Sequence, residues 1–261
     1  MLMPAGFAGL EQQLWIWLVA MIRPGAAFLA APVFGVASVP VQLRLVVALA
    51  IGMAGLSAQP FHLPPDGVAS IAGVAMVMGE VLAGLAMGFA VQIGFSAAML
   101  AGETIGNTMG LGFAGMVDPM SGAASPALGQ FLSILATFLF LAIGGHLTLA
   151  AIVVESYRAL PVGAAWPAAQ SLHGLILFGG DLFAAGLAIA LPVGFALVLV
   201  QIVMGMLARS APAMNLFAVG LPATLLAGLV LLAVAAPSIG EGITAAIERG
   251  LDAARAIALG K

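Results

Sequence analysis

The chain has 261 residues, of which 63% are hydrophobic and only 7% charged, and its formal net charge is -3. Soluble domains contain roughly 45–50% apolar and about 25% charged residues, so this composition predicts an integral membrane protein. Seven basic residues are too few for a surface that binds nucleic acid or anionic lipid, and the absence of cysteine excludes disulfides, thiolate catalysis and cysteine-ligated metals.

The N-terminal part predicts two apolar helices joined by a short connection. The first covers residues 14–31 and contains Arg23, and the second covers residues 41–58 and contains Arg44 near its start. The two arginines therefore bracket one loop. They can anchor this loop at the cytoplasmic face, or a guanidinium can pair with a carboxylate elsewhere in the bundle. The pattern favours the first interpretation.

Residues 67–101 form an apolar run that is too long for one straight crossing. About 35 residues at ~1.5 Å per residue reach ~50 Å, whereas the hydrocarbon core is ~30 Å thick. We therefore expect this helix to be bent or broken. Gly84 and Gly88 form a motif for close helix packing. Glu80 lies inside the run, and its sequence context favours a buried, hydrogen-bonded structural acid over a proton relay.

Residues 102–119 (GETIGNTMGLGFAGMVDP) are the least lipid-like part of the middle of the chain. Gly102, Gly106 and Gly110 recur every four residues and would form one smooth stripe on a helix. We expect the helix to fail near Gly110, because more glycines follow and Asp118-Pro119 is a turn dipeptide.

Two polar residues lie on a second stripe beside these glycines, Glu103 and Asn107. A lipid-facing carboxylate would be costly, so we expect hydrogen bonds inside the protein to hold Glu103. An irregular segment at membrane depth must be buried in protein or line a water-filled cavity. This segment is therefore the first candidate for a functional site.

Residues 126–154 predict the next span, and Tyr157 and Trp166 after it are expected to mark a membrane interface. His146 lies within the span. A lone histidine there is more typical of packing with a satisfied hydrogen bond than of a pH switch, because no acid is paired with it.

Residues 172–208 form a second overlong apolar run, interrupted by Gly179-Gly180-Asp181 and by Pro192. Either feature can break a helix, so we expect two half-helices or a hairpin. Interrupted spans are typical of secondary transporters. The only candidate coupling acids for such a transporter are Glu80, Glu103 and Asp181.

The final span is expected at residues 216–235, capped by Asn215 and ended by Pro237. Residues 238–261 alternate charged and apolar side chains and predict an amphipathic helix outside the hydrocarbon.

The chain carries no motif of an enzyme. A phosphate-binding loop, an HExxH sequence and a supported Ser/His/Asp arrangement are all absent, and the carboxylates are spread singly. We therefore expect no catalysis, cofactor or metal. The predicted fold is a single all-α membrane domain over residues 1–261, with about six hydrophobic segments and a glycine-rich region at residues 102–126 between the third and fourth.

Three segments together resemble the FliR family, a component of the flagellar type III protein-export gate. They are residues 102–119 followed by Leu128, GGHL at residues 144–147, and ARSAPAMNLFAVGLP at residues 208–222. Ala213 departs from the family, which more often has glutamine there. The resemblance implies an all-helical subunit of the bacterial inner membrane at the flagellar basal body. It also implies FliP-like and FliQ-like partners in the channel, nearby FlhA-like and FlhB-like components, and unfolded protein substrates.

The resemblance also implies roles for particular residues. The glycine-rich loop would be a plug in the channel lumen, formed by Gly106, Met109, Gly110, Gly112, Phe113, Met116, Asp118 and Pro119. Polar groups with a structural role in the membrane would be Glu80, Glu103, Asn107 and Asp181. Packing between subunits would use Gly84, Gly88, Pro212, Asn215 and Phe217. The homologous subunit of a virulence injectisome is the alternative within the same architecture, and a secondary transporter is the alternative outside it.

Overall fold

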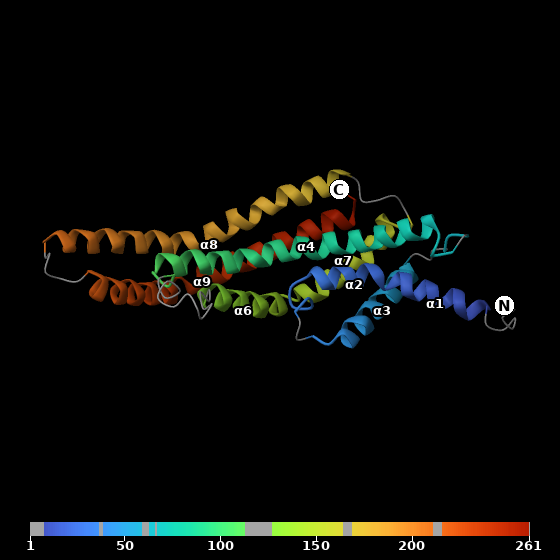
Figure 1. Cartoon of the computed structure of the whole chain (residues 1–261), viewed down its shortest axis with the longest axis horizontal. Coiled ribbons are helices and arrows are strands. Elements are labelled where there is room, and N and C mark those ends of the chain that lie inside the picture. Colours follow the sequence, from blue (N-terminus) through green and yellow to red (C-terminus); the bar gives the residue numbers. More distant parts are fainter. Residues whose placement is uncertain are drawn as a thin grey trace. The chain divides into compact units, whose positions relative to one another are not determined.

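The computed structural model describes residues 8–36, 39–58, 63–65, 67–112, 127–163, 169–210 and 216–260. The regular structure in these ranges is entirely α-helical, which confirms the predicted fold class. The helices, coloured along the chain in Figure 1, are α1 (Ala8–Ala20), α2 (Ile22–Ala30), α3 (Val41–Ala58), α4 (Ile71–Thr108), α6 (Ala127–Ala142), α7 (Gly145–Ala159), α8 (Ala169–Ser210) and α9 (Leu216–Ala258).

The described helices include four spans that are long and apolar enough to cross a membrane. They are residues 9–30, α4, most of α8 and most of α9, and the bent pair α6–α7 adds a fifth if it is counted as one span. The predicted number of about six hydrophobic segments is therefore not confirmed. The described chain divides into two compact units, which we call unit 1 (residues 1–93, 143–179 and 248–261) and unit 2 (residues 94–142 and 180–247).

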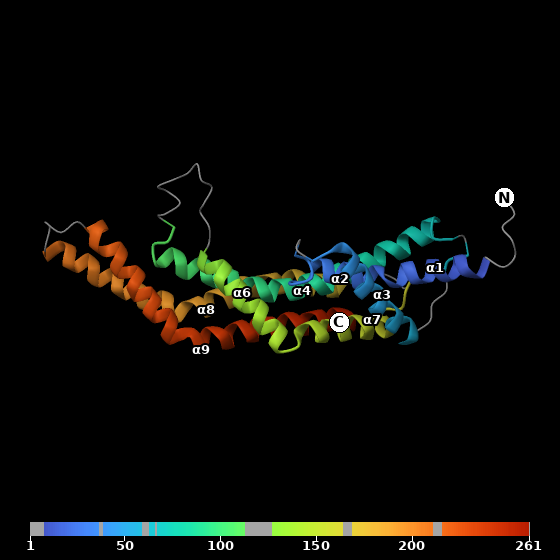
Figure 2. The same cartoon turned by 90° about the horizontal axis from the view of Figure 1, so that it is seen from below.

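Unit 1 is built on close packing around α2. The helix α3 packs against α1, α2 and α7 (Figure 2). Gly84 and Gly88 of α4 lie directly on the backbone of α2, where a Cβ added at Gly84 would be 3.0 Å from Ala27 N, and one added at Gly88 3.0 Å from Ala27 C. The pair makes a close approach to α2 of the same chain, and its expected role in packing between subunits stays a prediction.

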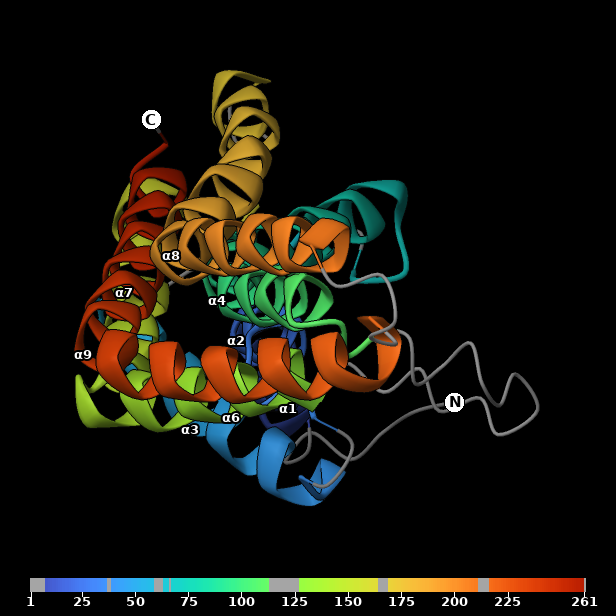
Figure 3. The same ribbon diagram turned by 90° about the vertical axis from the view of Figure 1, so that its left-hand side faces the viewer.

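Unit 2 joins the second part of α4 to α6, α8 and the first part of α9 (Figure 3). Gly102 of α4 faces Gly129 of α6, where an added Cβ would be 2.6 Å from the Gly129 Cα. Gly186 of α8 faces Leu100 of α4, and Gly242 of α9 faces Ile189 of α8. Small residues let these helices approach closely, which is the usual basis of helix association in membranes.

The two overlong runs are continuous helices. The helix α4 has 38 residues and α8 has 42, with Pro192 inside α8. The predicted breaks and hairpins are therefore wrong, while the predicted bends stay a prediction. Proline removes only one backbone donor, and a membrane helix tolerates this where neighbouring groups satisfy the freed carbonyl.

The region predicted as one span at residues 126–154 is instead divided. The helix α6 ends at Ala142 and α7 begins at Gly145. Gly144 between them has a φ of 68°, in the left-handed region that glycine adopts without steric cost. The predicted span therefore consists of two helices that are bent at this glycine, and they pass as one broken span only when they are taken together.

The last helix, α9, continues through Pro237 to Ala258, so the predicted helix end at Pro237 is wrong. The C-terminal part of α9 has buried apolar and exposed charged positions. Ile243 and Ile247 are buried, whereas Arg249 and Asp252 are exposed. The tail is thus a continuation of α9 with one apolar face.

Candidate functional site

The glycine-rich segment leaves α4 through a well-defined helix end. The amide of Leu111 donates to the Gly106 carbonyl at 3.0 Å, and that of Gly110 donates to the Asn107 carbonyl at 3.1 Å. Gly110 has a φ of 87°. These are the features of a Schellman motif, in which a left-handed residue stops the helix. The prediction that the helix fails near Gly110 is confirmed.

Met109 packs against α9 of unit 2 and is hydrogen-bonded to it. Its side chain is only 2% exposed, and it lies against Gly228 of α9. The Thr224 hydroxyl donates to the Met109 carbonyl at 3.3 Å, and Gln201 Nε2 donates to the Thr108 carbonyl at 2.8 Å. Sequence reasoning missed Gln201 and Thr224, although each is a single polar residue in a strongly apolar run.

Beyond Met109 the segment becomes accessible. Leu111 is 39% exposed, and Gly112 is exposed as well. Asn107, in the last turn of α4 before Met109, is also exposed. Phe217 belongs to the first turn of α9. The remaining predicted plug and packing residues lie outside the described residues, namely Phe113, Met116, Asp118, Pro119, Pro212 and Asn215.

Three predicted polar groups have no partner within the described part of the chain. Glu103 and Asp181 are partly buried and form no hydrogen bond or ion pair with another described residue, so the expectation that hydrogen bonds hold Glu103 stays a prediction. His146 is partly buried, and its Nδ1 has no partner among the described residues. The satisfied hydrogen bond expected for His146 is therefore absent there.

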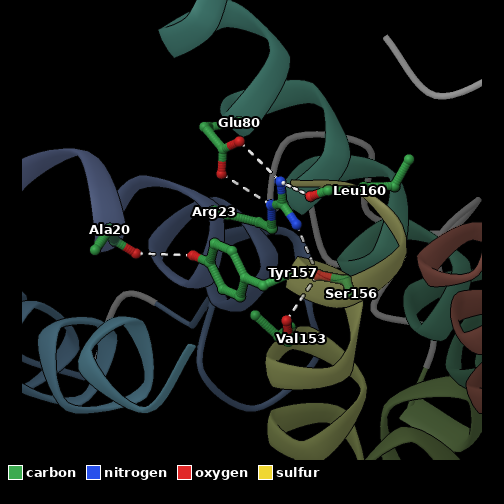
Figure 4. Close-up of polar contacts among 7 residues, drawn as sticks. All are labelled: Ala20, Arg23, Glu80, Val153, Ser156, Tyr157 and Leu160. Carbon is green, nitrogen blue, oxygen red and sulfur yellow. Dashed lines mark hydrogen bonds and ion pairs between the residues drawn. The ribbon is translucent and has the colours of Figure 1, made fainter. Parts of the chain in front are cut away.

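Unit 1 contains a buried charge cluster around Arg23 (Figure 4). The guanidinium binds Glu80 in a bidentate manner, with Nε donating to Oε2 at 2.9 Å and Nη2 to Oε1 at 2.8 Å. It also donates to the Ser156 hydroxyl at 3.0 Å and to the Leu160 carbonyl at 2.8 Å. Arg23 and Glu80 are each 2% exposed. The cluster joins α2, α4 and the end of α7.

Tyr157 completes this cluster. Arg23 Cζ lies 4.3 Å from the centre of the tyrosine ring, and the ring hydroxyl donates to the Ala20 carbonyl at 2.9 Å. Tyr157 is 1% exposed, so the prediction that it marks an interface is wrong. Its ring is in the core because it covers the guanidinium.

The cluster decides between the alternatives left open for its charged residues. Glu80 is the predicted buried, hydrogen-bonded structural acid. The favoured anchoring role of Arg23 is wrong, because its guanidinium pairs with a carboxylate on another helix. Arg44 instead donates to the Val36 carbonyl. Both Glu80 oxygens are engaged by one cation, so this carboxylate holds helices together and is not free to bind an ion.

Within the described residues, neither region brings together the ligands of a metal centre. Groups of three or more histidine, cysteine, aspartate or glutamate side chains that could hold a metal ion do not occur among the described residues. The described polar groups of these two regions form hydrogen bonds and, around Arg23, an ion pair with Glu80. They can position helices and one helix end.

The chain is similar to known proteins over most of its length. Residues 14–250 match the family described as bacterial export proteins, family 1. The flagellar biosynthetic protein FliR of Escherichia coli (strain K12) is 34% identical over 226 residues, which cover 87% of this chain and 85% of that protein. FliR of Pectobacterium carotovorum is 33% identical, with 85% and 86% covered. FliR of Bacillus subtilis (strain 168) is 29% identical, with 84% and 85% covered. These matches, together with the apolar spans, place the chain in family 1 of the bacterial export proteins, to which it belongs.

Proposed function

We propose that this chain is the FliR-like subunit of a flagellar type III protein-export gate in the bacterial inner membrane. The observation that carries the proposal is the family match over residues 14–250. In this proposal the chain forms a protein-conducting channel with FliP-like and FliQ-like subunits. FlhA-like and FlhB-like components lie nearby, and unfolded flagellar proteins pass through. The chain itself performs no catalysis.

The outward-facing side chains of α8 and α9 support burial in an assembly or a bilayer. Apolar surfaces of this extent are rare on soluble monomers and indicate contact with a membrane or with other proteins. The large exposed side chains with at least 60% exposure on these helices are Ile176, Leu177, Phe183, Phe195, Met206, Leu226, Leu229, Val230 and Val234.

Within the gate, we assign the segment from Gly106 to Pro119 to closure of the conduit. The Schellman motif at Gly110 directs the chain away from the axis of α4, and Leu111 is accessible immediately after it. Phe113 and Met116 would be the obstructing groups, since a large ring and a flexible thioether fill an irregular opening well.

The injectisome alternative has less support, since the relatives described above carry flagellar names. The transporter alternative is weakened by Glu80. A coupling acid must exchange its ion or proton, whereas Arg23 holds both oxygens of Glu80 at 2.8 to 2.9 Å. Glu103 and Asp181 would then be the only acids left for coupling.

Co-purification tests the proposal. An affinity-tagged copy of the chain, expressed from its own chromosomal locus, should bring down FliP-like and FliQ-like proteins from detergent-solubilised membranes. A tagged, unrelated membrane protein of similar size serves as the control. Recovery of the chain alone or as a homo-oligomer, with none of these partners, would contradict the proposed function.

A further inference from the structure

The last carbonyl groups of α4 can each be assigned a hydrogen-bond partner. A helix leaves its final carbonyls without partners from its own turns, and a membrane interior offers little water to replace them. The Ile105 carbonyl accepts from the Met109 amide at 2.9 Å, and the Schellman motif satisfies Gly106 and Asn107. The carbonyls of Thr108 and Met109 remain.

Side chains from two other helices satisfy these two carbonyls. Gln201 of α8 donates to the Thr108 carbonyl at 2.8 Å. Thr224 of α9 lies 3.3 Å from the Met109 carbonyl, and it shares its single hydroxyl hydrogen with the Gly220 and Leu221 carbonyls of its own helix. The Gln201 bond is therefore the stronger link, because its donor is not shared with its own helix.

A close contact between side chain and backbone also positions Met109. The Met109 side chain lies on Gly228 of α9, where an added Cβ would come within 2.6 Å of both Met109 Cγ and Met109 Cε. Carbon atoms that are not bonded normally stay about 3.5–4.0 Å apart, so a side chain at residue 228 would displace Met109 from this position. Gly228 is also buried.

We infer that Gln201, Thr224 and Gly228 form an anchor that fixes Thr108 and Met109, so that these two residues keep their positions while the gate works. Only the effect of this anchor on transport rests on the proposed function, whereas the contacts that form the anchor do not. Its donors come from α8 and α9, and its acceptors are the carbonyls that the Schellman motif leaves over.

Cross-linking tests the anchor directly, because the natural chain has no cysteine. In the variant Met109→Cys/Gly228→Cys, the two Cβ atoms would be at most about 4 Å apart, since the 2.6 Å contact at Met109 Cγ is extended by one bond. Disulfides need about 3.5–4.5 Å between Cβ atoms. Met109→Cys/Gly205→Cys is the control, because a Cβ added at Gly205 would meet nothing within 4 Å.

We expect an added oxidant to cross-link the first variant and not the control. Export of flagellar proteins, measured in this variant before and after oxidation, should not change when the cross-link forms, whatever the rate of the reduced variant relative to the natural chain. Failure to cross-link would overturn the anchor geometry, and export that stops only in the oxidised state would show that Met109 moves. Export that fails in the reduced variant and in the natural chain would count against the proposed function, while the cross-link still reports on the anchor.

Substitution of Gln201 gives a second test in the full complex. Gln201→Leu removes the donor and keeps an extended side chain. Ion leakage through the resting complex should rise roughly threefold, the population change expected for loss of one hydrogen bond between membrane helices. Gly228→Ala should act in the same direction, and Gly194→Ala, which meets nothing within 4 Å, should not. Leakage equal to that of the natural chain in Gln201→Leu and Gly228→Ala would overturn the anchor.

Discussion

At the scale of single residues, Arg23 is a buried cation whose partners come from distant parts of the sequence. Glu80 is 57 residues away, and Ser156 is 133 residues away. A charge inside an apolar bundle is costly unless it is paired and its hydrogen bonds are made. The bidentate carboxylate, the hydroxyl, a carbonyl and the Tyr157 ring together meet this requirement.

Removing one member of this pair should be much worse than removing both. Glu80→Gln and Arg23→Met should each lower the free energy of unfolding by about 3–5 kcal/mol, because each leaves one buried charge without its counter-charge. The double variant Arg23→Met/Glu80→Met should recover part of this loss. Thermal unfolding of the purified protein in detergent measures it. Single variants as stable as the natural chain would show that the pair is unimportant.

Tyr157 allows its hydroxyl to be separated from its ring. Tyr157→Phe removes only the bond to the Ala20 carbonyl and should cost about 1 kcal/mol. Tyr157→Ala also removes the ring that covers Arg23 and contacts Gly55, and it should cost about 3–5 kcal/mol. The same thermal measurement applies. Equal losses in the two variants would mean that the ring contributes nothing beyond its hydroxyl.

At the scale of helices, the sequence predicts well where local signals act alone. The predicted helix at residues 41–58 coincides with α3, and the glycines after Asn107 correctly mark the end of α4. The main errors concern two prolines. Pro192 and Pro237 were expected to interrupt helices, yet α8 and α9 continue through both prolines. The penalty of about 3 kcal/mol for proline in a helix interior does not end a membrane helix where neighbouring groups satisfy the freed carbonyl.

The glycine pair of α4 provides a test at this scale. Gly88→Ala should destabilise the protein by about 1–3 kcal/mol, because its Cβ would overlap the backbone of α2 near Ala27. Gly174→Ala on α8 is the matched control, since an added Cβ there meets nothing within 4 Å. It should be neutral or slightly stabilising. Equal stabilities of the two variants in detergent would contradict the packing of α2 against α4.

At the scale of the whole molecule, the sequence motifs identify the family but not the contacts that organise the two units. The sequences of residues 102–119 and 208–222 already resemble the FliR family, and the family match over residues 14–250 confirms this resemblance. The partner of Glu80 could not be predicted, because several cations lie at comparable sequence distances and pairing depends on how α2, α4 and α7 pack. Gln201 and Thr224 were missed for the same reason.

The central proposal is that the segment from Gly106 to Pro119 closes a conduit in an assembled export gate. Its most direct test is small-ion leakage through cells whose complex carries the chain with residues 110–115 deleted. Co-purification of the FliP-like and FliQ-like partners verifies that the complex is assembled. We expect leakage well above that of the natural complex, because the groups that exclude water and ions are displaced while the helix packing remains. Leakage unchanged in an intact complex would show that the segment is a scaffold and not a gate.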